Sequence, residues 1–445
     1  MQYEWANSKT EKWLNEDNST GVILVDGHVK TYSGSQTDLP KRYKTGRRLC
    51  LSGMMDYWVN DEIGRPLFVI TTVLTSGMTK MIRDEIVPKI LSNLKNCPSD
   101  EELVNDPDLH KFILIYDRDS YGFLLMLLMR QQHIACQTYN KYPGEKWPES
   151  DFSTKEVRLV HGNIEMMEMA ERVYSVKVKN EESEKHQLKV REVRCLMANG
   201  HQTAIISTDY KSTIDGIASN MFARWCQENY LKYMGEHFAL DSLVDYGLQE
   251  IGGTSVFVSP IYKKAESLVK SLANKIGTLQ KKLGKLMGYD EQSSENEKRQ
   301  VEVKTEKETI KLEIESVQKE LAQAKTKKKE TPKHMKIEDF PDEEKFKQLS
   351  LPGKHFMNII KMTSYRAETA MAILIAKWQT ETKTDSRSIS RGLYASDADI
   401  LPDHQNMILN IKIHTQSTPN LNKITQKLCD YLNEGNHFYP GTKYK

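Results

Sequence analysis

Two short runs of consecutive apolar residues stand out along the chain. Residues 21–25 read Gly-Val-Ile-Leu-Val and residues 112–116 read Phe-Ile-Leu-Ile-Tyr, and the runs are followed by Asp26 and Asp117. A continuous apolar run is typical of a strand that is buried on both faces of a sheet. A carboxylate at the carboxyl end of a central strand lies where α/β folds place their chemistry. The pattern therefore predicts a central sheet whose strands deliver two acids.

The segments around these runs predict the rest of an α/β core. Gly27 is expected to permit a tight turn into a hairpin partner. The predicted elements are strands at 28–32, 49–59, 67–74 and 133–139, and helices at 81–94 and 123–129. Three strands, a helix and a further strand with a second acid follow the order of a ribonuclease H-like mixed sheet. The predicted fold class is therefore α/β.

Two later regions depart from this core. Residues 143–212 hold four short alternating runs separated by charged or Gly/Asn turns, which predict an inserted antiparallel β-domain. Residues 261–332 are rich in Lys, Glu and Gln, with apolar positions three or four residues apart. This spacing predicts a coiled-coil hairpin with its tip at 288–296. An intramolecular hairpin is the simplest interpretation, and a dimer contact or a DNA-bracing arm is the alternative.

These patterns divide the chain into six predicted parts. They are an N-terminal helical segment (1–20), the first part of the core (21–142), the β-rich insertion (143–212), the second part of the core (213–260), the coiled-coil hairpin (261–332) and a C-terminal α/β region (333–445).

Charge and cysteine content narrow the class of protein. The 63 basic and 61 acidic residues leave a net charge of +2, so nucleic-acid binding would depend on local basic patches. The six cysteines are scattered singly, which indicates reduced thiols and argues against a zinc site. No window resembles a membrane span or a signal peptide, so we expect a soluble intracellular protein without a membrane partner.

A third acid joins the two that follow the apolar runs. Glu228 lies within a segment of helical periodicity at 213–233, so Asp26, Asp117 and Glu228 are each positioned by a regular element. Magnesium prefers oxygen ligands, and a pair of such ions can activate a hydroxyl and stabilise a leaving oxygen in phosphoryl transfer. By spacing alone, helix caps and solvated helix faces explain such acids as well.

Longer stretches of sequence resemble a known family. They resemble bacterial insertion-sequence transposases of the DDE type, in the subgroup whose ribonuclease H-like core carries a β-rich insertion before the final Glu. The resemblance runs from about residue 20 to the end of the chain. It rests on Val25–Gly34, Asp56–Asp61, Ile115–Arg118, Arg224–Tyr233, Tyr365–Thr369 and Tyr439–Gly441.

The resemblance implies a mechanism and its partners. Asp26, Asp117 and Glu228 map to a catalytic triad that holds two Mg²⁺ ions, with Mn²⁺ as a substitute. The implied activity is hydrolysis at transposon DNA ends followed by transfer of the freed 3′-hydroxyl into target DNA. The expected partner is double-stranded DNA, bound by a homodimer, in the bacterial cytoplasm.

The chain departs from the family pattern in two ways. Positions where the family tends to have Tyr and Lys around its Glu are Met221 and Gly235, which leaves Arg224 and Lys232 as the nearby basic candidates. The family is also expected to carry an N-terminal helix-turn-helix region, and this chain opens almost directly on the core. A truncated remnant that binds DNA without cleaving it is therefore one alternative, and a coiled-coil scaffold without catalysis is another.

Several further residues are candidates for DNA contact, each with a structural alternative. Asp119 is expected to cap the following helix rather than bind metal. Trp225 and Tyr230 are expected to pack in the core or at an interface in preference to stacking on a base. Tyr365, Arg366 and Glu368 form either a buried ion-pair anchor or a second DNA contact. The predicted DNA-binding set is Arg224, Lys232, Lys41, Arg42, Lys44, Arg47, Arg48, His28 and Trp225.

Overall fold

The computed structural model describes most of the chain as two compact units. The first comprises residues 1–33, 40–246 and 350–445, and the second comprises 34–39 and 247–349. The predicted N-terminal helix (1–20) and most of the predicted hairpin tip (290–296) lie outside the described residues. The described residues are 21–34, 39, 41–44, 49–72, 77–94, 97–159, 162–179, 183–243, 248–249, 256–289, 297–341, 348–379 and 385–434.

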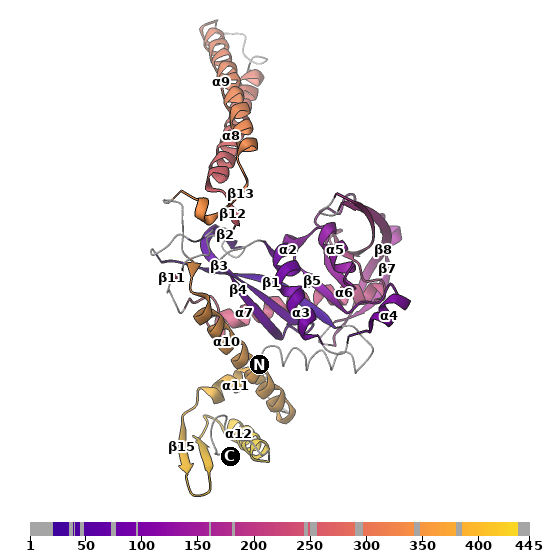
Figure 1. Ribbon diagram of the computed structural model, residues 1–445, viewed down its shortest axis with the longest axis vertical. Coiled ribbons are helices and arrows are strands. Elements are labelled where there is room, and N and C mark those ends of the chain that lie inside the picture. The colour runs from indigo at the N-terminus through magenta and orange to yellow at the C-terminus, as the bar shows by residue number, and fades with distance from the viewer. Residues whose placement is uncertain are drawn as a thin grey trace. The chain divides into compact units, whose positions relative to one another are not determined.

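The first unit is built on a ten-stranded mixed sheet (Figure 1). Its order is β2-β3-β1-β5-β6-β10-β9-β8-β7, and β4 also pairs with β3. Strands β1, β5 and β6 run parallel, whereas β3 is antiparallel to both β1 and β4. The strands are β1 (Val22–Thr31), β2 (Lys41–Lys44), β3 (Leu49–Asp61), β4 (Pro66–Thr72), β5 (Phe112–Tyr116), β6 (Ile134–Tyr139), β7 (Ser153–Arg158), β8 (Ile164–Lys179), β9 (Lys185–Leu196) and β10 (Gln202–Ser207).

Strand β1 is longer than the sequence analysis predicts. It continues through Gly27, which pairs with Tyr57 of β3, so the prediction of a turn at Gly27 is wrong. Glycine has a different effect there. A Cβ at this position would lie 3.3 Å from the sulfur of Met55, so its absence lets the Met55 side chain pack closely against β1.

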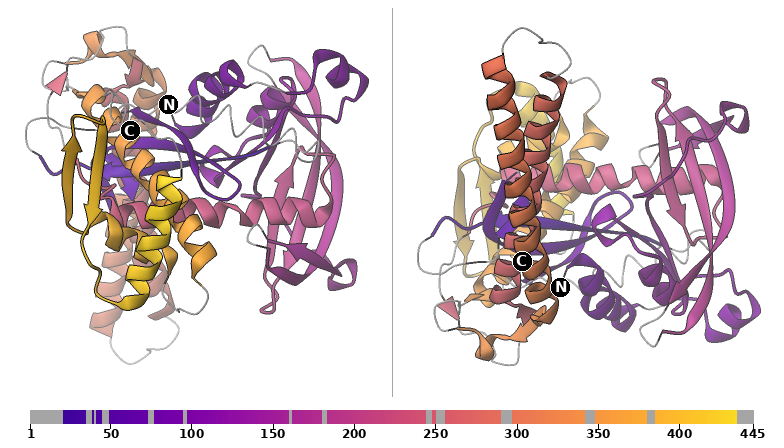
Figure 2. Two further views of the ribbon diagram at one scale, coloured as in Figure 1. Left: turned by 90° about the horizontal axis from the view of Figure 1, so that it is seen from below. Right: turned by 90° about the horizontal axis from the view of Figure 1, so that it is seen from above.

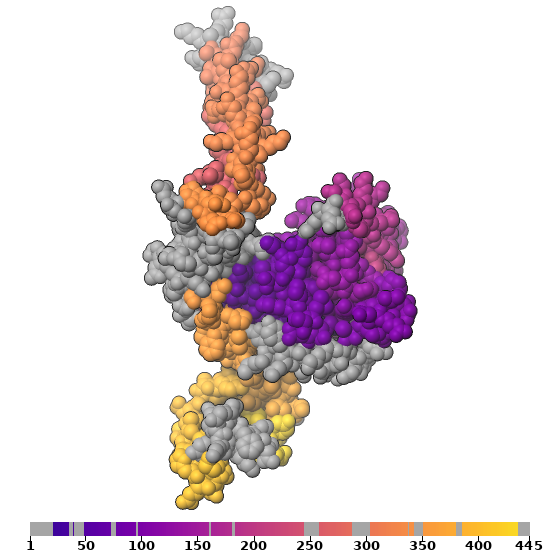
Figure 3. All heavy atoms as spheres, viewed as in Figure 1, coloured from indigo at the N-terminus to yellow at the C-terminus, as the bar shows by residue number. Residues whose placement is uncertain are grey.

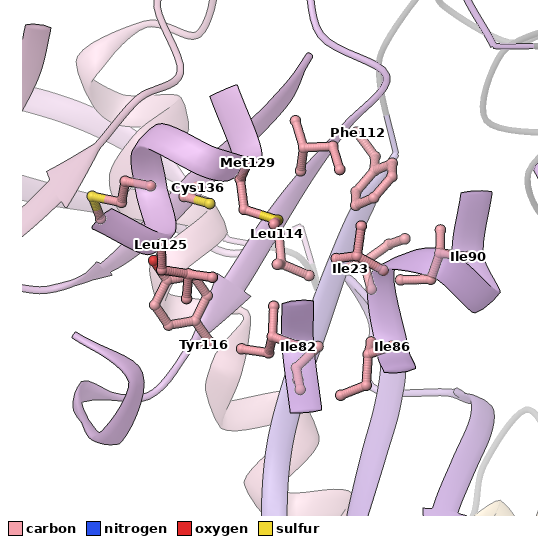
Figure 4. Packing of buried hydrophobic residues seen from close by; sticks show 14 of the residues in the cluster. Ile23, Ile82, Ile86, Ile90, Phe112, Leu114, Tyr116, Leu125, Met129 and Cys136 are labelled. Carbon is pink, nitrogen blue, oxygen red and sulfur yellow. The ribbon is translucent and has the colours of Figure 1, made fainter. Parts of the chain in front are cut away.

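The central strands are buried on both faces, as their apolar runs predict. Alternate residues of β1 and β5 enter two separate hydrophobic clusters, with Ile23 and Leu114 on one face and Leu24 and Ile115 on the other. The first cluster is closed by a helix of 78–93, which contains a π-helical turn at Ile82–Ile86, and by α5 (Phe123–Arg130) (Figure 4). Helix α6 (Ile214–Phe222) covers the second cluster.

Strands at residues 153–207, where the sequence analysis expects a β-rich insertion, extend the core sheet. Strand β10 pairs antiparallel with β6, and β9, β8 and β7 follow outward in turn. The long magenta strands β8 and β9 lie beside the purple elements of the core (Figure 2). Val190 of β9 also contributes to the first hydrophobic cluster, so core and insertion share one interior.

Helices at the C-terminal end complete the first unit. Helix α10 (Leu351–Trp378) packs on β4, and its Met362 and Tyr365 join a cluster with Trp58 and with α7 (Arg224–His237). Beyond it lie α11 (Ser386–Tyr394), the hairpin of β15 (Ala398–Asp403) and β16 (Ile408–Ile413), and α12 (Pro419–Asn433).

The second unit consists mainly of two long antiparallel helices. Helices α8 (Pro260–Tyr289) and α9 (Glu297–Glu330) lie against one another along their length (Figure 3). Leu272, Leu279 and Val317 are among the residues that fill the seam between them. Short strand pairs, β12 (Val256–Val258) with β13 (His334–Lys336) and β11 (Leu248–Gln249) with β14 (Gln348–Leu349), complete this unit. Of the helices described, none is long and apolar enough to cross a membrane.

A buried polar network joins α10 to the sheet. The ammonium of Lys30 on β1 lies 2.8 Å from Asp56 of β3, and both side chains are almost completely buried. Asn358 of α10 accepts a hydrogen bond from Lys30 and donates to Asp56 and to Thr71 of β4. Four elements are therefore joined at one point. Removing either charged side chain leaves the other buried without its partner.

We predict that Lys30→Met destabilises the first unit by about 3–5 kcal/mol, because it leaves the Asp56 carboxylate buried without a cation. The double variant Lys30→Met/Asp56→Leu should recover at least half of that loss. Urea unfolding followed by circular dichroism measures both. Equal losses in the two variants would show that the charge pair is not what stabilises this junction.

Candidate active site

The two strand acids lie side by side where parallel strands separate. The pairing of β1 with β5 ends at Val25 and Tyr116, and the next residues are Asp26 and Asp117. Asp26 is in mid-strand, because β1 continues along β3, whereas Asp117 follows the end of β5. The register of the sheet therefore brings together two residues that are distant in sequence.

Arg224 connects all three predicted acids. Its Nη1 lies 3.0 Å from Asp117 Oδ1, and its Nη2 lies 3.4 Å from Glu228 Oε1 and 4.0 Å from Asp26 Oδ2. The guanidinium is buried, with 8% of the side chain exposed, whereas 53% of the Glu228 side chain is exposed. The structure thus places the three carboxylates around one cation.

Contacts on both sides of Glu228 fix the position of α7. Gln227 donates from Nε2 to the carbonyl of Trp58 at 3.0 Å and to the side chain of Asn60 at 2.8 Å. Tyr230 is buried, with its ring 5.4 Å from that of Trp58 and 4.8 Å from that of Tyr365. Gln227 is a residue that the sequence analysis missed, because a polar residue in an amphipathic helix reads as solvent-facing.

A tight turn between β3 and β4 also supports the first turn of α7. Gly64 has φ +82°, and a Cβ there would lie 2.5 Å from the carbonyl oxygen of Cys226. Only glycine adopts this conformation at low cost and leaves room for the helix backbone. The turn itself is held by Asp61, which accepts hydrogen bonds from the backbone amides of Ile63 and Arg65. Gly64 is the second positioning residue without a recognisable sequence signal.

The charges at the site are incompletely balanced. Burial raises the pKa of Asp26 to about 6, while Arg224 and a hydrogen bond from the Gly27 amide lower it, and the charges of Asp117 and Glu228 raise it. Three carboxylates against one guanidinium leave a formal charge of −2. This excess of negative oxygen donors suits a hard divalent cation.

The described residues contain no group of three His, Cys, Asp or Glu side chains arranged to hold a metal ion. The carboxylates are turned to Arg224 instead. Donor chemistry and charge therefore fit a cation, and the observed partner of the acids is the guanidinium.

Other predicted site residues have separate environments. His28 Nε2 lies 3.0 Å from Asp241, and Lys232 is exposed one turn after Glu228. Trp225 is 69% exposed, so it does not pack in the core, and interface packing stays a prediction for it. Tyr230 is buried, which confirms the expectation for that residue. Met221, where the sequence resemblance implies a Tyr, is fully buried in the second hydrophobic cluster.

Two local predictions near the acids need correction. Asp119 does not cap the helix that follows, because the residue before α5 is Gly122, with no side-chain cap, and Asp119 is exposed. The predicted basic loop at 41–48 is in part strand β2, which pairs with β3. The side chains of Lys41, Arg42, Lys44, Arg47 and Arg48 lie outside the described residues.

The contacts of the Tyr365 region bear on its two proposed roles, a buried ion-pair anchor and a second DNA contact. Glu368 is 2% exposed and lies 3.3 Å from Arg387 and 3.9 Å from Arg391. It also accepts a hydrogen bond from the Tyr233 hydroxyl, and Arg387 donates to the hydroxyl of Tyr365. These contacts favour the ion-pair anchor, which joins α7, α10 and α11.

The raised pKa of Asp26 gives a prediction for stability against pH. A folded-state pKa of about 6 lies above the unfolded value of 3.8, so the folded protein binds more protons between these values and loses stability as pH rises through them. Asp26→Asn removes this penalty. Relative to the wild type, its unfolding free energy should rise by about 2 kcal/mol from pH 4 to pH 7. Urea unfolding in EDTA measures this, and a constant difference would contradict it.

Comparison with known proteins gives the family. A model of a protein family described as "Transposase protein" matches residues 2–445. No curated protein matches the chain. Because the match covers nearly the whole sequence, the chain belongs to this family of transposases, which are DNA-processing enzymes.

Proposed function

We propose that the chain is a DDE transposase, which cleaves transposon DNA ends and transfers the freed 3′-hydroxyl into target DNA. The observation that carries this proposal is the convergence of Asp26, Asp117 and Glu228 within 4.0 Å of one guanidinium. The three acids come from two adjacent parallel strands and a helix more than a hundred residues further along the chain. Incidental surface acids have no reason to meet in this way.

The order of the core strands supports the same proposal. Strands β4, β3 and β1 form an antiparallel succession, and β5 and β6 continue it in parallel with β1. This is the arrangement expected of a ribonuclease H-like core. The β-rich insertion precedes the helix that carries Glu228, as the sequence resemblance implies.

Each residue has a defined role in the proposed mechanism. Asp26, Asp117 and Glu228 would hold two Mg²⁺ ions, with Mn²⁺ as a substitute. Such ions supply activation of the attacking hydroxyl and stabilisation of the leaving oxygen. Arg224 balances part of the carboxylate charge before DNA binds, and a phosphodiester would offer its guanidinium other anionic oxygens. Gln227 and Gly64 position α7, and hence Glu228, against the sheet.

The central test is Asp117→Asn, compared with Asp119→Asn as a matched control. Loss of one metal ligand should reduce Mg²⁺-dependent nicking of transposon-end DNA by more than about 100-fold. DNA binding should be retained. The exposed Asp119, two residues further on, should be dispensable. Gel-based nicking and gel-shift assays give the two readouts. Equal nicking by Asp117→Asn and the wild type would refute the assignment.

The same assays separate the alternatives. Binding by the wild-type protein without cleavage in Mg²⁺ or Mn²⁺ would indicate a remnant that only binds DNA. Absence of DNA binding at low salt, together with no thermal shift in Mg²⁺, would indicate a scaffold.

Arg224→Gln tests the role of the buried cation. Removing the guanidinium changes the formal charge of the cluster from −2 to −3, so Mn²⁺ should bind roughly tenfold tighter in the absence of DNA. Arg224→Lys keeps the charge and should retain an affinity near that of the wild type. Titration calorimetry measures both variants after circular dichroism shows that they are folded. Weaker Mn²⁺ binding by Arg224→Gln would contradict this role.

A further inference from the structure

A groove lies along α7 next to the stripe that carries Arg224 and Glu228. Its volume is about 710 Å³, and it lies between strands β8 and β9 of the insertion and the junction of α6 and α7. Trp225 and Asn229 of α7 line the groove, whereas Arg224 and Glu228 carry the acid cluster. Residues four apart lie on one face of a helix, so the two pairs form adjacent stripes on the same two turns.

The groove exposes an unusual amount of apolar side chain. Trp225 is 69% exposed, Met166 is 66% exposed and Met197 is 51% exposed, and all three line it. Leu159 and Phe222 extend the apolar lining. Contiguous exposed apolar surface of this kind marks interaction sites, and methionine adapts well to the side chains of a partner.

The charge on the groove has one sign. Glu149, Glu165 and Glu168 line it, and none of the described residues that line it is Lys, Arg or His. Three carboxylates repel phosphates, so the groove is unsuited to a DNA backbone. The complementary ligand instead combines large apolar side chains with basic groups at their flanks.

We propose that this groove docks a segment of a partner protein in which large apolar residues are flanked by Lys or Arg. The apolar side chains lie over Met166, Met197 and Trp225, and the basic groups meet the three glutamates. One feature favours a peptide segment over a small molecule. The acids are separated, with Glu149 before β7 and Glu165 and Glu168 on β8, so that one extended chain can meet all three.

The groove and the acid cluster lie on adjacent stripes of α7, and none of Asp26, Asp117 and Glu228 lines the groove. The proposal concerns protein binding and holds whether or not those acids cleave DNA.

The test uses the full chain and two synthetic peptides. The first is a 14-residue amphipathic helix made of Leu and Lys, and the second has the same Leu positions with Glu in place of Lys. Fluorescence anisotropy of labelled peptide gives the affinities. The Lys peptide should bind at least about tenfold tighter than the Glu peptide. Trp225→Ala should weaken binding of the Lys peptide by about tenfold.

Charge reversal provides the sharper variant. Glu149→Lys/Glu165→Lys should invert the preference in favour of the Glu peptide. Glu308→Lys, an exposed position on α9, is the matched charge control, and Ile400→Ala, an exposed apolar residue on β15, is the matched apolar control. Both controls should bind the Lys peptide as the wild type does.

Four results would overturn the proposal. They are failure of the Lys peptide to bind, equal binding by wild type and Trp225→Ala, and displacement of the peptide by a single-stranded oligonucleotide whose own binding requires Trp225. The fourth is a concentration-dependent dimer that is lost in Trp225→Ala, which would identify a second copy of the chain as the occupant.

Discussion

The arrangement of the first unit depends on one buried cation. Three carboxylates from β1, β5 and α7 would repel one another in a partly buried site if nothing lay between them. Arg224 supplies the opposite charge from within the same helix as Glu228, one turn before it. Its position requires that α7 meet the sheet where β1 and β5 separate, which is why so many contacts of the unit serve to place this helix.

Those contacts follow a pattern along β1. As far as Val25 the strand is apolar on both faces, and beyond it every second residue is polar. Asp26 meets Arg224, His28 meets Asp241, and Lys30 meets Asp56 and Asn358. Side chains two apart share a face of a strand, so one face of β1 carries a row of polar residues that pair with residues of α7, β3 and α10 and with Asp241. The first half of β1 therefore lies in the hydrophobic core, and its second half makes polar contacts with elements that come later in the chain.

Parts of this arrangement follow from sequence, and others require the fold. The apolar runs before Asp26 and Asp117 predict buried strands, because continuous burial leaves that signature. The pairing of Arg224 with Glu228 follows from helical spacing, but its contacts with Asp26 and Asp117 depend on the sheet register. The turn predicted at Gly27 is wrong, because a glycine that permits close packing looks the same in sequence as one that permits a turn. Gln227 and Gly64 leave no local signal at all, because their partners lie on other elements.

The distance along the chain between the acids has a consequence for synthesis. Asp26 emerges from the ribosome about two hundred residues before Glu228, and the whole insertion is made in between. Contacts between residues this far apart in sequence are intrinsically slow to form. A nascent chain that ends before α7 holds Asp26 and Asp117 without Arg224, so the acids acquire their counter-ion only when translation has passed the insertion. The order of the elements thus delays assembly of the site until the surrounding sheet is complete.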